Sequence, residues 1–174
     1  MYVADGLAGF QIFDLASPGF PALRSDFPTV LRAADIISTN DLAYVAAGEN
    51  GLHIYSLTNL WSPRLISRCV GVTNARAIAL SGTTAYVGDG QYGLKIINVA
   101  DPAAPVLLGS YTNASMGSIR NVGASGSLAV ISDGRTLLLV DASTPANPSL
   151  VGTYSSTNFV FSLAAANSKA YLAT

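Results

Sequence analysis

Residues 85–111 have the sequence AYVGDGQYGLKIINVADPAAPVLLGSY, and this stretch decides the fold. Its apolar and β-branched residues gather in three short runs, which are Ala85–Gly88, Gly93–Val99 and Val106–Tyr111. Such runs between turn residues predict β-strands. Asp89-Gly90 predicts a hairpin turn that needs positive φ, and the prolines fall only in the second connection, where no ladder N–H is lost. A further strand ends over Ile78–Ser81, so the unit has four strands.

The same pattern recurs along the chain. Further copies begin at Met1 (MYVADGLAGFQIFDL), Ala43 (AYVAAGENGLHIYSL) and Ala129 (AVISDGRTLLLVDAS), and a partial copy begins at Ala170 (AYLAT). The units are approximately residues 1–42, 43–84, 85–128 and 129–169, with the partial fifth unit at 170–174. Four strands in a repeat of roughly 40 residues are typical of a β-propeller blade. A β-solenoid is the structural competitor, but its coils are usually shorter and contain fewer hairpins.

We therefore predict an all-β protein, a single β-propeller domain over residues 1–174 with four-stranded antiparallel blades. Three stretches resemble the LVIVD repeat family of bacterial and archaeal proteins; they are YVADGLAGFQIFDL from Tyr2, YVGDGQYGLKIINVADPAAPVLLGSY from Tyr86 and LLLVDASTPANPSLVGTY from Leu137. The resemblance covers essentially the whole chain. It implies a propeller and a cell-surface or secreted location. It carries over no catalytic residues, because the family pattern defines architecture rather than chemistry.

The composition excludes several classes of function. Half of the residues are hydrophobic and 11% are charged, yet no window approaches the ~20 uninterrupted apolar residues of a membrane-spanning helix. A net charge of -1 without a basic stripe argues against nucleic acid as a partner. A neutral polar surface with two lysines, Lys95 and Lys169, is common on extracellular and cell-surface proteins. The single cysteine, Cys69, excludes an internal disulfide and predicts a buried, inert thiol.

Both ends of the sequence interrupt a repeat. Met1 begins in the second strand of a unit, and Thr174 ends within the second strand of another. We therefore expect a fragment of a longer propeller with more blades. In the alternative, Val160–Ala166 acts as a spare innermost strand and closes a four-bladed ring against the first unit. An unclosed array would expose strand edges, through which we expect self-association.

Two motifs with a chemical resemblance are explained better as turns. Gly88–Gly93 matches the G-x-G-x-x-G dinucleotide fingerprint, but a strand follows it where that fingerprint needs a helix. Asp5, Asp89 and Asp133 share one repeat position and could in principle bind Ca²⁺. Adjacent blades would hold these loops far apart, and Asp-Gly turns explain the aspartates. The sequence therefore predicts no cofactor and no metal.

The only histidine, His53, aligns with Gln11, Lys95 and Leu138. A position this variable in the middle of a strand is interpreted as a tolerated flank rather than a general base. A Ser-His-Asp triad could use only His53, and no serine lies in a G-x-S-x-G elbow. The chain is accordingly predicted not to be an enzyme.

The best candidates for a binding site lie just before and at the start of the innermost strands. Arg76 aligns with Arg120, Phe161 and Ala34, and Arg32 lies two residues before Ala34. Asp35, Ala77, Asn121 and Ser162 share the next position. In a propeller these residues surround one mouth of the central channel, on the side of the Asp-Gly hairpins. The predicted ligand-binding residues are Arg32, Asp35, Arg76, Arg120, Asn121 and Phe161.

For the arginines themselves the sequence favours a structural interpretation, in which they hydrogen-bond loop carbonyls or pair with Asp35. We predict a non-enzymatic scaffold that binds a protein or polymer ligand. Trp61, on the opposite face, could anchor a partner or could equally cover a blade edge. Two alternatives remain open. The chain could belong to a propeller enzyme, hydrolytic or metal-dependent, whose catalytic groups lie in further blades, or it could be a structural spacer. Two or more carboxylates with raised pKa at the mouth would favour the enzyme.

Overall fold

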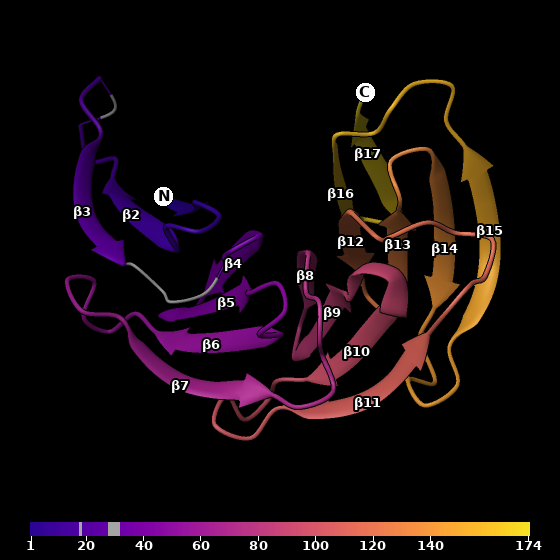
Figure 1. The fold of residues 1–174 in the computed structure, drawn as a ribbon, viewed down its shortest axis with the longest axis horizontal. Helices are drawn as coiled ribbons and strands as arrows, with labels where there is room; N and C mark the ends of the chain where they lie inside the picture. Colours follow the sequence, from indigo (N-terminus) through magenta and orange to yellow (C-terminus); the bar gives the residue numbers. More distant parts are fainter. Residues whose placement is uncertain (18, 28–31) are drawn as a thin grey trace.

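The computed structural model describes residues 1–17, 19–27 and 32–174, which form an arc of five antiparallel β-sheets (Figure 1). We number these sheets as blades 1 to 5 in chain order. Blade 1 has three strands: β1 (Tyr2–Ala4), β2 (Phe10–Asp14) and β3 (Ala22–Phe27). Blade 5 has two strands: β16 (Ser162–Ala166) and β17 (Lys169–Ala173).

Blades 2, 3 and 4 each have four strands in sequential order, from the inside of the arc to its outside. Blade 2 consists of β4 (Asp35–Thr39), β5 (Leu42–Ala46), β6 (Leu52–Ser56) and β7 (Arg64–Cys69). Blade 3 consists of β8 (Ala77–Ser81), β9 (Thr84–Gly88), β10 (Leu94–Asn98) and β11 (Val106–Tyr111). Blade 4 consists of β12 (Asn121–Ser125), β13 (Leu128–Ser132), β14 (Thr136–Asp141) and β15 (Ser149–Ser155).

These strands confirm the four-stranded unit predicted around residues 85–111. The expected order of strand, hairpin, strand, proline-containing connection and outer strand is present in blade 3. Gly90 has a φ of 56° in the hairpin, so the turn needs a residue that tolerates the left-handed region. Each complete blade also has an irregular register at the same place, after Ile54, Ile96 and Leu139 in the third strand. The repeat therefore extends to the bulges.

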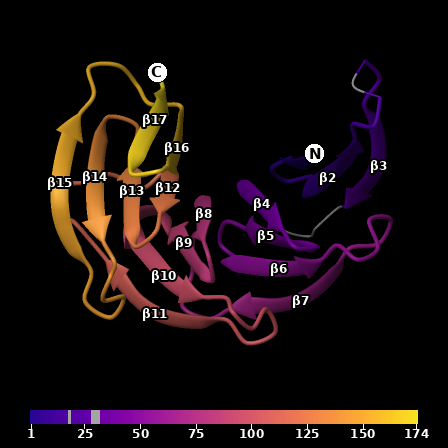
Figure 2. The same ribbon diagram turned by 180° about the vertical axis from the view of Figure 1, so that it is seen from behind.

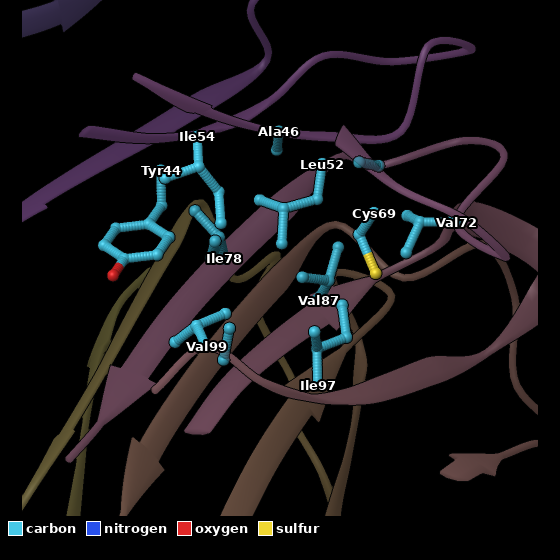
Figure 3. Packing of buried hydrophobic residues seen from close by; sticks show 12 residues of the cluster. Tyr44, Ala46, Leu52, Ile54, Cys69, Val72, Ile78, Val87, Ile97 and Val99 are labelled. Atoms are coloured by element: carbon cyan, nitrogen blue, oxygen red, sulfur yellow. The ribbon is translucent and has the colours of Figure 1, made fainter. Parts of the chain in front are cut away.

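The hydrophobic core lies between blades, because alternate side chains of each strand point to opposite faces. Figure 3 shows the junction between blades 2 and 3, where Leu52 and Ile54 pack against Val87 and Ile97. Cys69 is buried in the same cluster. Burial raises the pKa of its thiol, which agrees with the inert thiol predicted from the sequence.

Neighbouring blades are also joined by backbone hydrogen bonds at one end. The glycine of each hairpin between the second and third strands bonds a residue just before the inner strand of the next blade. Gly6 pairs with Ala33 and Gly48 pairs with Ala75, while the amide of Ile119 donates to Gly90 O at 3.0 Å. Because this hydrogen bond recurs, each inner strand has the same position relative to the preceding blade.

The arc is open. Figures 1 and 2 show the first and last blades at opposite tips, and β16 pairs with β17 rather than with β1. The alternative in which Val160–Ala166 closes a four-bladed ring within one chain is therefore wrong. Its physical obstacle is the curvature of the arc, which places β1 at the opposite tip (Figure 1), while β17 pairs with β16 along its length.

Candidate functional site

The residues just before each inner strand follow one pattern of burial. The residues two positions before the strand are buried: Ala33, Ala75, Ile119 and Val160. Their backbones bond the preceding hairpin and their side chains enter the junction between blades. The next residues are exposed: Ala34, Arg76, Arg120 and Phe161. Because successive side chains alternate, this position faces the inside of the arc.

Two adjoining pockets occupy this inner surface, which we call the mouth. The first, of about 440 Å³, has apolar residues such as Leu7 and Ala34 in its lining together with the polar and charged residues Arg32, Glu49, Asn74, Arg76 and Arg120. The second, of about 490 Å³, is lined by a set that includes Asp35, Arg76, Arg120, Asn121 and Phe161. Arg76 and Arg120 belong to both pockets. The structure thus places all six predicted site residues around one concave surface.

The arginines of the mouth have few intramolecular partners. Among the described residues, no hydrogen bond or ion pair comes from the guanidinium of Arg32, Arg76 or Arg120. The Arg120 guanidinium lies 5.8 Å from the ring centroid of Phe159, a cation–π contact. The structural interpretation, in which these arginines pair with Asp35 or bind loop carbonyls, therefore has no support in this part of the molecule.

Among the described residues, Asp35 joins two inner strands and forms no ion pair with an arginine of the mouth. Its carboxylate accepts hydrogen bonds from the amides of Ile36 at 2.8 Å and Ile78 at 2.9 Å, and so joins β4 to β8. Burial raises its pKa, and these two amides only partly oppose that effect. Asn121 acts at the equivalent place two blades on, where Nδ2 donates to Val160 O at 3.3 Å. Asp35 thus connects two neighbouring inner strands, and Asn121 connects β12 to the residue two positions before β16.

Phe161 completes the mouth on the side of blade 5. Its side chain is 73% exposed and packs edge-on against Phe159, with 5.1 Å between ring centroids. An exposed aromatic ring beside Arg120 combines an apolar surface with a cationic donor. That combination suits a ligand that presents both an apolar group and an anion.

Two of the three hairpin aspartates, Asp89 and Asp133, bond the connection before their own blade, which turn preference did not predict. Asp89 is fully buried and accepts hydrogen bonds from the amides of Thr73, at 2.9 Å, and Asn74, in the connection that precedes its blade. Asp133 bonds the amide of Gly117 at 3.0 Å in the same manner. The constant spacing of 16 residues was the available signal.

The environment of Asp133 shows the electrostatic consequence of this arrangement. Burial raises the pKa of Asp133, but amide hydrogen bonds from Thr136, Arg135 and Gly117 outweigh burial and lower the pKa below its usual value. Asp5 is exposed in blade 1. The described ranges contain no group of three or more histidine, cysteine, aspartate or glutamate side chains that could hold a metal ion.

The interpretation of His53 as a tolerated flank is wrong. The side chain is fully buried, with Nε2 at 3.2 Å from Asn50 O and Nδ1 at 3.4 Å from the Tyr55 hydroxyl. Burial and the nearby charge of Arg68 lower its pKa to about 4, against a weaker opposing effect of Asn50. The variable alignment concealed this burial, because the residue is packed differently at each junction.

Two other predicted features are located as follows. Gly90–Tyr92 forms one short 3-10 turn and β10 follows, so the glycine-rich motif has no helix for a pyrophosphate. Trp61 is 67% exposed in the connection between β6 and β7, and the Arg24 guanidinium lies 5.5 Å from its ring centroid. This connection lies at the end of the blade opposite the mouth.

Comparison with known families agrees with the repeat. The family model described as the LVIVD repeat matches three times, at residues 32–70, 73–113 and 116–156, which together make up more than half of the chain. The chain belongs to the LVIVD repeat family. Each LVIVD match contains one complete blade, from its inner to its outer strand. No curated protein matches the sequence.

Solved structures show the same fold at low identity. The computationally designed Ika8 protein matches with a TM-score of 0.69 and 11% identity, over 92% of this chain and 48% of that protein. U3-55K matches with a TM-score of 0.64 and 14% identity, over 79% and 44% respectively. The WD40 repeats of RRP9 match with a TM-score of 0.62 and 14% identity, over 79% and 43%.

WD40 repeats form β-propellers, so the LVIVD chain is a propeller repeat module. It spans about half the length of the designed protein and less than half of the other two. Within the part of the chain that the structure describes, no helix is long and apolar enough to cross a membrane.

Proposed function

We propose that this LVIVD module is a non-enzymatic scaffold whose mouth binds an anionic segment of a protein or polymer ligand. One observation carries the proposal: Arg32, Arg76 and Arg120 line a single concave surface, and their guanidinium groups have no ionic or hydrogen-bonding partner among the described residues. A guanidinium presents a planar fork of donors that matches carboxylate, sulfate or phosphate groups.

The arrangement of the arginines supports a ligand that has several regularly spaced anionic groups rather than a single small ion. Arg76 and Arg120 project from the same position of consecutive blades, so their spacing follows the repeat. A polymer or peptide with regularly spaced anions could contact both. Phe161 and Asn121, at the far side of the mouth, would add one apolar and one polar contact. Glu49 also lines the surface, and would disfavour anions close to it.

The alternatives receive less support. Asp35 is the carboxylate of the mouth whose pKa is raised, and it is hydrogen-bonded to two amides of the inner strands rather than paired with a second carboxylate. This is not the paired arrangement that acid–base catalysis would use. A structural spacer would need no concave surface with converging polar groups. The neutral polar surface with two lysines supports an extracellular or cell-surface location.

Isothermal titration with an oligomer of glutamate tests the proposal, with an oligomer of glutamine as the neutral probe. We expect binding of the glutamate oligomer that weakens as salt is raised, and at least a tenfold loss of affinity in the Arg76→Ala, Arg120→Ala double variant. Arg64→Ala is the matched control, because Arg64 is an exposed arginine on the outer strand β7. Equal affinities for the two oligomers, or an equal loss in the Arg64 variant, would contradict the proposal.

A further inference from the structure

The two ends of the arc each have an uncovered apolar surface. At one end, an apolar groove of about 390 Å³ lies on the face of blade 4 that is turned toward blade 5. The third and fourth strands of a complete fifth blade would cover this groove. Residues that line it are Val130, Leu137, Leu139, Tyr154, Ala170 and Leu172. At the other end, blade 1 lacks an inner strand, and Phe13 and Leu15 lie on the side away from blade 2.

These two surfaces correspond to surfaces that pack together inside the chain. Phe13 occupies the repeat position of Tyr55, Ile97 and Val140, all of which are buried against the preceding blade, whereas Phe13 is partly exposed. Its equivalence to Tyr55 is set by the register, since the irregularity of the ladder falls just before each residue.

The groove at the other end contains the position that packs against Tyr55 inside the chain, namely the position of Phe27. Tyr154 pairs with Leu137 across β15 and β14, as Phe27 pairs with Phe10 across β3 and β2. Phe27 packs edge-on against Tyr55 of the next blade, with ring centroids 5.6 Å apart. Tyr154 is therefore the equivalent of Phe27. Among the described residues no aromatic ring packs on it, and its side chain is 59% exposed.

We propose that a second copy of this chain covers the groove, with Phe13 of each copy packed against Tyr154 of the other. Strands β2 and β3 of one copy would supply the outer half of the blade that β16 and β17 of the other begin. The second strand of this shared blade has two candidates, because β1 and β17 carry the similar sequences Tyr2-Val3-Ala4 and Tyr171-Leu172-Ala173. One of these two strands is displaced in the dimer.

The shape of the arc allows two such contacts at once. Its two tips stand apart on the same side (Figure 1), so a second arc turned about a two-fold axis meets both tips. Two copies would make a ring of about eight blades, within the range known for propellers. Both sets of mouth arginines would then surround one channel.

Size-exclusion chromatography with light scattering tests the dimer. We expect twice the 17.9 kDa mass of the chain at micromolar concentration. Phe13→Arg alone and Tyr154→Arg alone should each give the mass of one chain with an unchanged far-ultraviolet circular dichroism spectrum. Phe20→Arg is the matched control, since Phe20 is 85% exposed in blade 1 outside the proposed contact, and its mass should not change.

A charge pair makes the test specific to the proposed contact. Tyr154→Glu alone should be monomeric, and combining Phe13→Arg with Tyr154→Glu in one chain should restore the dimer. A wild-type chain that stays monomeric, forms open-ended oligomers larger than two, or keeps its dimer mass in both single arginine variants would overturn the proposal. The Arg76→Ala, Arg120→Ala variant should keep the dimer mass, so a failure of anion binding and a failure of dimerisation are distinguishable.

Discussion

The junction between blades 1 and 2 and the junction between blades 2 and 3 use the same repeat positions with different side chains. The first is aromatic, and Phe10, Phe27 and Tyr55 form a cluster with ring centroids 5.3 to 5.6 Å apart. The second has aliphatic side chains at these positions, with Leu52 and Ile97 at the positions of Phe10 and Tyr55, although Tyr44 also lies in its cluster; we call it the aliphatic junction. The backbone bridge between hairpin and next inner strand is the same in both.

This difference teaches how the repeat tolerates variation. The hydrogen bonds that position the blades come from the backbone, so the side chains between them can change size together. Cys69 stands at the position of Phe27, and the smaller side chain faces the smaller Ile97.

His53 and Lys95 share a further position of the repeat. His53 is fully buried, whereas Lys95 reaches past the junction to Tyr92 O at 3.1 Å and to Asp89 at 3.9 Å.

Truncation of the aromatic junction should have the largest effect. Phe10→Ala removes a fully buried ring that contacts two others, and we expect a loss of about 3–5 kcal/mol in the free energy of unfolding. Urea denaturation followed by circular dichroism measures it. Phe20→Ala, on an 85% exposed side chain of the same blade, should change stability by less than about 0.5 kcal/mol. Similar losses in the two variants would show that the junction does not determine stability.

The aromatic junction should also be the acid-sensitive one. The His53 imidazole has a pKa of about 4 in the fold and an ordinary value of 6.5, so between these values the unfolded chain binds the extra proton. The stabilisation is complete above pH 6.5 and is lost as pH falls toward 4, by up to about 3 kcal/mol. His53→Leu, which places the residue of blade 4 in blade 2, should remove this slope. Urea midpoints measured from pH 7 to 4 decide it, and an equal slope in both proteins would reject His53 as the cause.

The aliphatic junction should depend more on a polar contact beside it. Asp89→Ala leaves the amides of Thr73 and Asn74 without their acceptor, and we expect a loss of about 1–3 kcal/mol. Blade 2 has Ala47 at the position of Asp89, so this contact distinguishes the two blades. Asp26→Ala, on an exposed aspartate of β3, is the control for loss of charge. Thermal unfolding of both variants would contradict the contact if their midpoints shifted equally.

The smallest effect concerns the opening of the aliphatic junction. Cys69 is 5% exposed and burial raises the pKa of its thiol, so a thiol reagent should label it in seconds to minutes only after unfolding in urea. Ile54→Val, a small deletion in the same cluster, should raise the labelling rate of the folded protein severalfold through a cost of about 1 kcal/mol. Rapid labelling of the native wild-type chain would mean that the junction is not closed.

Much of the fold was predictable because the same pattern of strand and turn residues recurs in each repeat. Strand boundaries in blade 3, the positive φ of Gly90 and the arrangement of blades all follow from spacing and turn residues. The positions of Arg76 and Arg120 followed from alignment with the inner strands. The burial of His53 and the partners of Asp89 did not, because each depends on a residue from another strand or blade.

The open arc was also beyond the sequence. Val160–Ala166 has the pattern of an inner strand, and local preference cannot tell whether β17 or β1 pairs with it, since both carry similar side chains. Only the curvature that accumulates over successive junctions places β1 at the far tip (Figure 2).

By itself, therefore, the sequence determined the blade: four strands, their turns, and the exposed arginines just before two inner strands. Tertiary structure alone decided which carboxylates are hydrogen-bonded, that Arg76 and Arg120 have no ion-pair partner among the described residues, and which apolar surfaces are uncovered at the tips. The physical reason is range. Strand and turn preferences act over a few neighbouring residues, whereas burial, hydrogen-bond partners and ring closure depend on groups that come together only when the blades pack.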